Sequence, residues 1–316
     1  MTRYALALDL GGTHVRAAVV DERGHVLRAV RTRTHAEQGP DAVIERMLAL
    51  ARQILEQRSE DERILGVGVA APGPVDVASG MVMHPPNLPG WRTVPLADLI
   101  SQSLDVPVWL GNDANLAALG EHRFGAGRGV AHLIYITVST GIGGGIIVDN
   151  RLLVGAHGLA AEVGHMPLVP EGPLCGCGHR GHLEAIASGP SIAREAQAAV
   201  ARGWKTSLAK VDHPLRAEDV VAAARDGDQV AREILARAGE FLGRGMALLA
   251  HLFDPQRFVI GGGVSNAGDL LLEPARAAAR RHVLPAYRDT FDVVRAQLGD
   301  DAGLVGAAAL VFDMVG

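Results

Sequence analysis

The chain has 316 residues, of which 48% are hydrophobic and 21% are charged, and its formal net charge is −5. That length is ample for two globular domains with sizeable cores. A negative net charge without a basic run disfavours nucleic acid as a partner, and no apolar run reaches the ~18 residues of a membrane-spanning helix. The N-terminal stretch MTRYALALDLGGT has no signal-peptide cleavage site, so we expect a cytoplasmic protein with reduced thiols and no membrane contact.

Strands and glycine turns dominate the beginning of the chain. Residues 4–9 and the stretch VRAAVVD predict two strands on either side of the turn GGTH, and VLRAVRTRT predicts a third strand. Apolar residues three and four positions apart between Val43 and Leu55 indicate a helix.

Two further strands are expected before residue 114. The run ILGVGVAAPGPVD is too continuously apolar for a half-exposed strand, so it predicts a buried strand that ends in a Pro/Gly loop. VPVWLGND predicts the next strand, and a helix over DANLAALGEHRF begins where that strand ends.

The second half of the chain repeats the opening pattern. HLIYITVSTGIGGGIIVDN, like ALALDLGGTHVRAAVVD, joins two apolar strands through a Gly-Gly turn that contains threonine, and both stretches contain a terminal aspartate. The repeat indicates an internal duplication, with two related halves that face each other.

Helices are expected over most of the remaining chain. Apolar spacing indicates them at roughly 191–202, 217–225 and 228–252. RFVIGGGVSN predicts a strand, a glycine turn and the start of a helix, and GLVGAAALVFDM predicts the last helix.

Three glycine-rich turns, at residues 11–13, 140–145 and 261–263, are candidates for binding phosphate. Such turns can direct several backbone N–H groups at one anion because no Cβ blocks the approach. None has the sequence G-x-x-x-x-G-K-[ST] of a P-loop, and a strand follows GIGGG where a Rossmann turn needs a helix. Phosphate binding here does not depend on a loop lysine, because Lys205 and Lys210 are the only lysines.

Together these turns resemble the motifs of a known superfamily. DLGGT, STGIGGG and IGGG are similar to the two phosphate motifs and the adenosine motif of actin-like ATPases and sugar kinases. The stretch VSTGIGGGIIVDNRLLVGAHGLAAEVGH resembles the signature of the ROK family (repressors, open reading frames and kinases). The resemblance runs from Asp9 to GLVGAAAL near the C-terminus.

The resemblance implies an α/β fold with two actin-like (ribonuclease H-like) domains around a cleft, each with a mixed sheet flanked by helices. The smaller domain would comprise residues 1–113 together with a C-terminal helix at about 302–316. The larger domain would comprise residues 114–301 and carry a cysteine-containing loop. A homodimer or homotetramer formed through the larger domain is also implied.

The resemblance also implies ATP and Mg²⁺ as cofactors. Asp9 would help to hold the magnesium ion through water, although by its position alone it is equally a turn residue at a strand end. The residues that match the ATP-binding motifs are Asp9, Gly11, Gly12, Thr13, Thr140, Gly141, Gly143, Gly261, Gly262 and Gly263.

Asp113 is the candidate catalytic residue. A carboxylate at a strand end, in a cleft between two halves, is suited to take the proton of a sugar hydroxyl as it attacks a γ-phosphate. The resemblance assigns that base to Asp113 in the sequence NDAN. The alternative is that Asp113 only caps the following helix.

The stretch LCGCGHRGHLEAIASGP holds both cysteines of the chain. A disulfide across CGC would be strained, and the resemblance implies a zinc site with one histidine and three cysteines. The matching residues are His165, Cys175, Cys177 and His182, so histidine replaces the last cysteine. Cys₂His₂ is an established structural zinc set, which predicts a structural zinc ion. The alternatives are His179 as the fourth ligand, or a metal-free turn with two reduced thiols.

The resemblance further implies a set of residues for hexose recognition. Paired acceptors such as Glu162 and Glu184 suit vicinal hydroxyls and penalise a sugar that leaves them unpaired. Taken alone, the two glutamates would be surface residues, His165 a turn residue and Gly73 part of a Pro/Gly turn. The matching residues are Gly73, Asn87, Asn112, Asp113, Glu162, His165 and Glu184.

We therefore expect an ATP-dependent kinase that phosphorylates the 6-hydroxyl of a hexose, with glucose as the first candidate. N-acetylglucosamine, N-acetylmannosamine or fructose remain open as acceptors, and polyphosphate remains an alternative donor. A sugar-responsive repressor of the same family would carry an added helix-turn-helix, and the first strand, which begins by residue 4, leaves no room for one.

Overall fold

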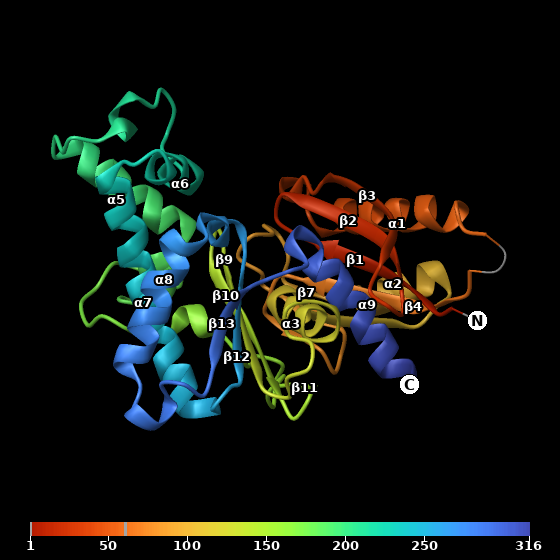
Figure 1. The fold of residues 1–316 in the computed structure, drawn as a ribbon. Helices are drawn as coiled ribbons and strands as arrows, with labels where there is room; N and C mark the ends of the chain where they lie inside the picture. Colours follow the sequence, from red (N-terminus) through yellow and green to blue (C-terminus); the bar gives the residue numbers. More distant parts are fainter. Residues whose placement is uncertain (1, 60–61) are drawn as a thin grey trace.

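The computed structural model describes residues 2–59 and 62–316, and it contains two large sheets with helices packed against them (Figure 1). The expected α/β fold with mixed sheets flanked by helices is confirmed. Within the described ranges, none of the helices combines the length and the apolar character that crossing a membrane requires.

The first sheet has the strand order β3-β2-β1-β4-β8. β1 is antiparallel to β2 and parallel to β4, while β2 is antiparallel to β3 and β4 is parallel to β8. All residues of β4 after its first two are buried, as its continuous apolar run predicts. The strands are β1 (Tyr4–Leu10), β2 (His14–Asp21), β3 (Val26–Arg33), β4 (Ile64–Ala71) and β8 (Val108–Asn112).

The second sheet repeats this arrangement with the order β11-β10-β9-β12-β13. β9 is antiparallel to β10 and parallel to β12. β10 is antiparallel to β11 and β12 is parallel to β13, so each strand pair has the direction of its counterpart in the first sheet. The shared topology is what an internal duplication predicts. The strands are β9 (Leu133–Val138), β10 (Ile142–Val148), β11 (Arg151–Leu152), β12 (Arg257–Gly261) and β13 (Asp292–Arg295).

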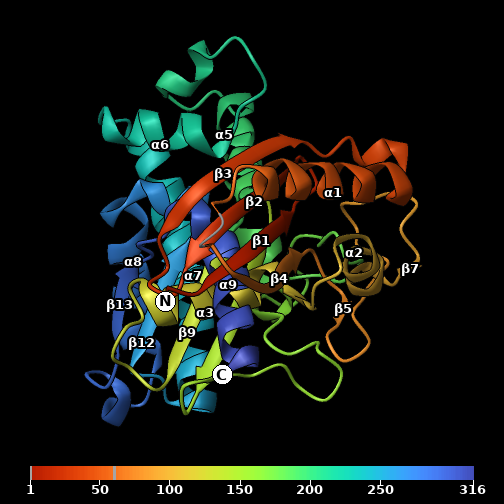
Figure 2. The ribbon, with the colours of Figure 1, turned by 90° about the vertical axis from the view of Figure 1, so that its right-hand side faces the viewer.

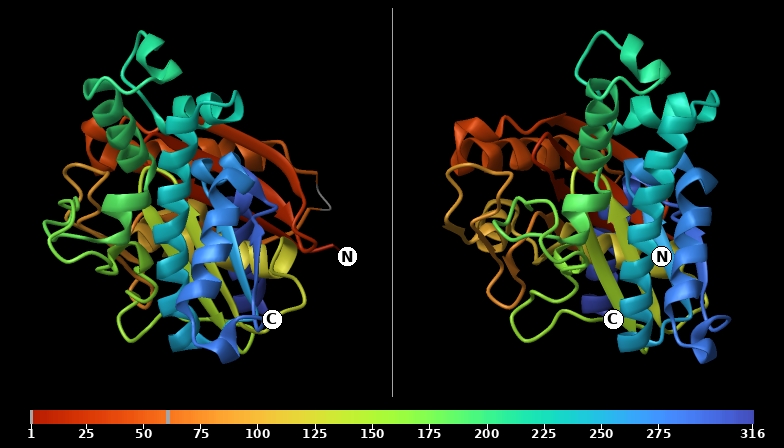
Figure 3. Two further views of the ribbon diagram at one scale, coloured as in Figure 1. Left: turned by 60° about the vertical axis from the view of Figure 1, so that its left-hand side comes forward. Right: turned by 90° about the vertical axis from the view of Figure 1, so that its left-hand side faces the viewer.

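Helices cover both faces of each sheet. α1 (Pro40–Glu56) and α2 (Leu96–Leu104) pack on one face of the first sheet (Figure 2). α7 (Gln229–Phe253) and α8 (Asp269–His282) share a hydrophobic core with β9 and β12 of the second sheet (Figure 3). The remaining helices are α3 (Asp113–Phe124), α4 (Leu183–Ala187), α5 (Gly189–Ala201), α6 (Ala217–Arg225) and α9 (Ala302–Val315).

Short elements complete the chain. A small antiparallel sheet lies between β4 and α2, and several 3₁₀ turns connect the larger elements. These elements are β5 (Val75–Asp76), β6 (Met81–Met83), β7 (Thr93–Val94), η1 (Ala36–Gln38), η2 (Val163–His165), η3 (Ser207–Lys210), η4 (Gly263–Ala267), η5 (Pro285–Tyr287) and η6 (Gly299–Asp301).

α3 and α9 are exchanged between the two halves. α3 follows the first sheet but packs on β9 and β10, whereas α9 follows the second sheet but packs on β1 and β4. The two helices also pack closely on each other, because a Cβ at Gly306 would lie 1.7 Å from the carbonyl oxygen of Leu116. The predicted division at residue 113, with 302–316 joined to the first domain, requires such an exchange, and it stays a prediction.

One helix start differs from the prediction. A helix was expected to begin within GVSN, but those residues form the 3₁₀ turn η4, and α8 begins at Asp269. The interruption is Gly268, whose φ of 62° lies in the left-handed region that favours glycine. The sequence patterns did not predict α2, α4 or β13, and they predicted only the start of a helix in the region of α8.

Candidate active site

The chain passes from β8 into α3 at two adjacent polar residues. Oδ1 of Asn112 accepts hydrogen bonds from the backbone N–H groups of Ala114 (3.0 Å) and Asn115 (3.1 Å), so Asn112 is the helix cap. In the part of the chain that the structure describes, the one neighbouring residue that donates a hydrogen bond to the Asp113 carboxylate is Ala114, through its N–H at 2.7 Å. The cap that was the alternative role for Asp113 is therefore supplied by its neighbour.

The environment of Asp113 favours a proton-accepting role. Its side chain is accessible to solvent, and the protein atoms packed around it still desolvate the carboxylate. Burial raises the pKa of Asp113 to about 6, the N–H of Ala114 opposes that rise, and the charges of Asp9 and Glu162 add to it. A carboxylate with this pKa is ionised at neutral pH and is a stronger base than an ordinary aspartate.

Asp9 lies near the end of β1 and is bonded to a residue that the sequence did not single out. Arg16, opposite it on β2, donates from Nη2 (2.6 Å) and Nε (2.9 Å) to the same oxygen, Oδ2 of Asp9. Burial raises the pKa of Asp9, Arg16 counteracts that rise, and Asp301 adds to it. The second oxygen, Oδ1, is not used by Arg16, so Asp9 can still contact a water molecule on a metal ion.

The first glycine turn is packed against the residue expected to contact the sugar. The Gly11 N–H donates to the carbonyl of His14 (2.9 Å) and is used by the turn itself. A Cβ at Gly12 would lie 3.2 Å from the Cβ of Asn87. Gly12 therefore allows the loop around Asn87 to approach the turn that contains Thr13.

The second glycine turn contacts both Glu184 and α3. The Ile142 N–H donates to Oε2 of Glu184 at 3.0 Å, and a Cβ at Gly141 would lie 2.6 Å from that oxygen. A Cβ at Gly143 would lie 3.0 Å from the Cβ of Ala114 in α3. Gly143, expected to contact phosphate, is thus also required for the close packing of α3 on β10.

A pocket of about 420 Å³ lies beside the second and third glycine turns. Thr140 and Gly263 line it, whereas Gly261 and Gly262 pack against β9, with their Cβ positions 2.4 Å from the Tyr135 hydroxyl and the Val138 carbonyl. The opposite wall comes from α5 and the start of α6, which the sequence predicted as helices without a role. The lining residues are Ser139, Thr140, Gly189, Pro190, Ala193, Arg194, Gln197, Leu215, Arg216, Ala217, Glu218, Gly263 and Val264.

Four of the residues expected to bind sugar lie close together beside Asp113. A Cβ at Gly73 would lie 2.9 Å from Nδ2 of Asn112 and 4.0 Å from Oε1 of Glu162. Nε2 of His165 lies 3.9 Å from Oε2 of Glu162. Polar side chains from two separate segments therefore lie in one region, and glycine at position 73 leaves the Asn112 amide its space.

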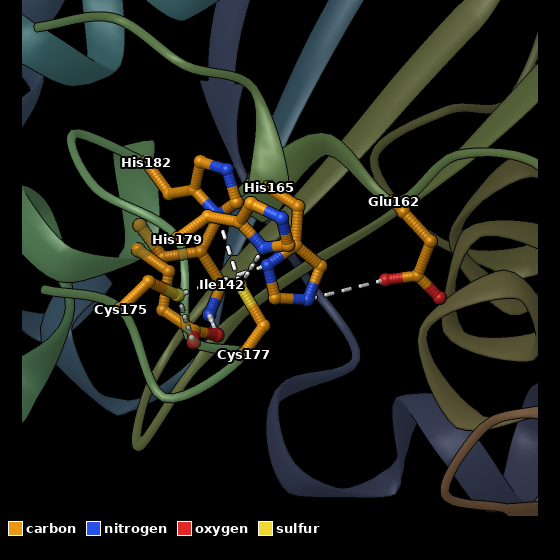
Figure 4. Close-up of polar contacts among 8 residues, drawn as sticks. Ile142, Glu162, His165, Cys175, Cys177, His179 and His182 are labelled. Carbon is orange, nitrogen blue, oxygen red and sulfur yellow. Dashed lines mark hydrogen bonds and ion pairs between the residues drawn. The ribbon is translucent and has the colours of Figure 1, made fainter. Parts of the chain in front are cut away.

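The cysteine loop brings the four expected metal ligands together (Figure 4). One ligand atom from each of His165, Cys175, Cys177 and His182 can be chosen so that all lie within 4.8 Å of one another. Nδ1 of His165 is 3.8 Å from Sγ of Cys175, and Nδ1 of His182 is 3.2 Å from Sγ of Cys177. A tetrahedral zinc ion holds neighbouring sulfur and nitrogen ligands about 3.6 Å apart, so this donor set fits zinc.

Local hydrogen bonds shape this loop for a thiolate ligand. The Cys175 N–H donates to the His179 carbonyl at 2.7 Å. The backbone N–H of His179 lowers the pKa of Cys177 to about 6, which favours the thiolate that binds metal. Nδ1 of His179 lies 3.8 Å from Sγ of Cys177, and its ring stacks on that of His182, so His179 stays the alternative ligand.

Comparison with known proteins agrees with this arrangement. A family model described as ROK family matches residues 5–314. A glucokinase from Thermotoga maritima is 39% identical over 318 residues, covering 98% of each chain. A crystal structure of a ROK family glucokinase from Streptomyces griseus in complex with glucose and AMPPNP has a TM-score of 0.84 at 40% identity, covering 98% of this chain and 99% of that chain. An N-acetylmannosamine kinase from Escherichia fergusonii is 35% identical, covering 96% of this chain and 97% of its own.

Proposed function

The chain belongs to the ROK family, and we propose that it is an ATP-dependent hexose kinase whose preferred acceptor is the 6-hydroxyl group of glucose. Full-length likeness to glucokinases supports a hexokinase-type phosphotransferase. The main support for this reaction is Asp113, which is accessible to solvent and whose pKa of about 6 suits a base at neutral pH.

Asp113 performs the proton transfer in this proposal. Its free carboxylate oxygen accepts the proton of the 6-hydroxyl as that oxygen attacks the γ-phosphorus. Asn112 holds the start of α3 through its two cap hydrogen bonds, which fixes the backbone that carries Asp113. Gly73 leaves room for the ring between Asn112 and Glu162.

The donor is ATP in preference to polyphosphate. The 420 Å³ pocket beside Thr140 and Gly263 suits an adenosine group, which polyphosphate lacks. The glycine turns at 11–13 and 140–143 orient the phosphates through backbone N–H groups. Asp9 holds the magnesium ion through water, and that ion neutralises phosphate charge when it is bound.

The cysteine loop holds a structural zinc ion in this proposal, with His165, Cys175, Cys177 and His182 as its ligands. His165 then has two functions, because Nδ1 faces Cys175 while Nε2 faces Glu162. The metal would orient the imidazole toward the sugar-binding glutamate.

A second acceptor class has specific support. The N-acetylmannosamine kinase from Escherichia fergusonii matches this chain over nearly its full length, so an N-acetylhexosamine is the alternative substrate. Glucose is preferred because the solved relative at 40% identity is a glucokinase in complex with glucose.

A sugar panel with ATP and Mg²⁺ tests the function. We expect ADP formation with glucose to exceed that with N-acetylmannosamine, N-acetylglucosamine and fructose, and Asp113→Ala to abolish it. Absence of sugar-dependent ADP formation with every sugar would reject the kinase. A preference for an N-acetylhexosamine would reject glucose alone.

A homo-oligomer formed through the larger half also belongs to the proposal. Leu248 and Leu252 lie one turn apart on α7 and are 45% and 72% exposed, and Leu284, 60% exposed, bonds the nearby His251 through its N–H. An exposed apolar group of this kind is typical of a subunit contact. Light scattering with size exclusion, applied to the wild type and to Leu252→Glu, tests it.

A further inference from the structure

Glu184 contacts two parts of the active site at once. Oε2 accepts the N–H of Ile142 at 3.0 Å, and Sγ of Cys175 lies 3.6 Å from Oε1. One carboxylate therefore lies between the start of β10 and the cysteine loop, and by the proposed function it also receives hydroxyl groups of the sugar.

The contact at Ile142 lies next to the donor pocket. The Ser139 N–H donates to the Gly141 carbonyl (2.8 Å), and the Gly189 N–H donates to the Ser139 carbonyl (2.8 Å). Ser139 and Gly189 both line the 420 Å³ pocket. A short chain of hydrogen bonds thus connects Glu184 to the wall of the nucleotide site.

The charge of Glu184 determines how sugar binding should affect the phosphate site. Without sugar, Glu184 occupies the Ile142 N–H and places a negative charge 2.6 Å from the Cβ position of Gly141, in a turn expected to receive phosphate. A carboxylate at this place disfavours a second anion. Sugar hydroxyls that donate to Glu184 would disperse its charge and compete with the Ile142 N–H.

We propose that Glu184 couples the two substrate sites, so that a bound sugar makes the second glycine turn a better phosphate site. This inference rests on the proposed function, because it takes Glu184 as a sugar contact. By linkage, the nucleotide must strengthen sugar binding by the same factor. Glu184 is thus a positioning residue for the donor as well as a contact for the acceptor.

Calorimetric titration of wild type with Mg-AMPPNP, with and without saturating glucose, measures the coupling. We expect glucose to tighten AMPPNP binding by about 10-fold. Glu184→Gln keeps an oxygen that can accept the Ile142 N–H but removes the charge. In that variant AMPPNP should bind more tightly without glucose than it does to wild type, and the effect of glucose should fall below about 2-fold.

Glu162→Gln is the matched control, because Glu162 is another proposed sugar contact and, within the described residues, it pairs with His165 and makes no hydrogen bond to the second glycine turn. It should weaken glucose binding and keep the 10-fold coupling. Coupling that survives in Glu184→Gln, or that is lost equally in Glu162→Gln, overturns the inference. Zinc content is measured for each variant, so that loss of the metal is not mistaken for loss of coupling.

If the Glu184 variant does not fold, amide hydrogen exchange of the wild-type protein, measured with and without glucose, provides the test instead. Glucose alone should speed exchange at Ile142, because its N–H loses the carboxylate acceptor. Bound glucose without that change overturns the inference. Coupled binding without formation of a sugar phosphate would instead reject the proposed function and leave the coupling intact.

Discussion

Arg16 holds Asp9 by a single carboxylate oxygen, with Nε at 2.9 Å and Nη2 at 2.6 Å from Oδ2. The same guanidinium reaches Asp301 at 3.4 Å, next to the start of α9. A Cβ at Gly303 would lie 3.4 Å from the other oxygen of Asp9, so glycine keeps that side open. Arg16 therefore compensates the charge of Asp9 without covering both of its oxygens.

Removing this guanidinium should destabilise the protein. The side chains of Arg16 and Asp9 are 22% and 17% exposed, so Arg16→Gln leaves a largely buried carboxylate without its partner. We expect a loss of about 2–3 kcal/mol in the free energy of unfolding, measured with urea. The double variant Asp9→Asn/Arg16→Gln should recover most of that loss.

Arg31→Gln is the control for Arg16. Arg31 lies opposite Arg16 on β3 and is exposed, so its loss should cost no more than about 0.5 kcal/mol. Strictly additive effects of Asp9→Asn and Arg16→Gln would contradict the compensation described here.

Asp113→Asn should separate activity from stability. The amide cannot take a proton from the sugar, so kcat should fall by about 10²–10⁴-fold with little change in the KM for glucose. Burial raises the pKa of Asp113, so its ionised form disfavours folding above about pH 6 and the penalty disappears below the unfolded pKa. The variant should therefore melt at a higher temperature than wild type at pH 8, and the gain should be smaller at pH 5. A lower melting temperature at pH 8 would contradict this explanation.

The pH profile should report the same carboxylate. If Asp113 is the base, kcat/KM falls as pH decreases through about 6, because protonation removes the acceptor. The charge of Glu162 contributes to that raised pKa, so Glu162→Gln should move the acid limb to lower pH. Glu45→Gln, on the exposed face of α1, should leave the limb in place. If the acid limb of Glu162→Gln instead moves to higher pH, this electrostatic effect is excluded.

Local patterns predicted the parts of the structure that depend on neighbouring residues. The strand–glycine–strand hairpins and the clustering of Cys175, Cys177 and His182 follow from short stretches of sequence. The pairing of Arg16 with Asp9 depends on the register of β1 against β2, which no pattern in either strand specifies. α8 was missed as a full helix because Pro274 interrupts its pattern and Gly268 delays its start.

Glycine was the hardest residue to interpret from sequence. A glycine that exposes an N–H to phosphate and one that admits a neighbouring helix look the same in a sequence. Gly143 contacts α3, and Gly262 packs under β9 with a φ of 81°, whereas Gly263 lines the pocket. The wall formed by α5 and α6 was not assigned, because its residues come from segments far from any glycine turn.

Metal analysis should identify the fourth zinc ligand. We expect about one zinc ion per chain in wild type and in His179→Ala, and a large loss in His182→Ala, because His182 lies closer to Cys177 than His179 does. Removal of the metal by a chelator should lower the melting temperature by about 5 °C or more, since zinc would link His165 to the cysteine loop that ends at His182. Loss of zinc in His179→Ala with retention in His182→Ala would reverse the assignment.

The donor pocket can be tested by filling it. Ala193 in α5 lines the 420 Å³ pocket, and Ala193→Phe should raise the KM for ATP by about 10-fold or more while glucose binding without nucleotide stays unchanged. Ala201→Phe is the control, because Ala201 is exposed at the end of the same helix and does not line the pocket. An unchanged KM for ATP in Ala193→Phe would show that adenosine binds elsewhere. Equally weakened binding of ATP and of inorganic triphosphate, added as a competitor, would mean that the phenylalanine disturbs the phosphate turns, because only ATP carries a base for this pocket.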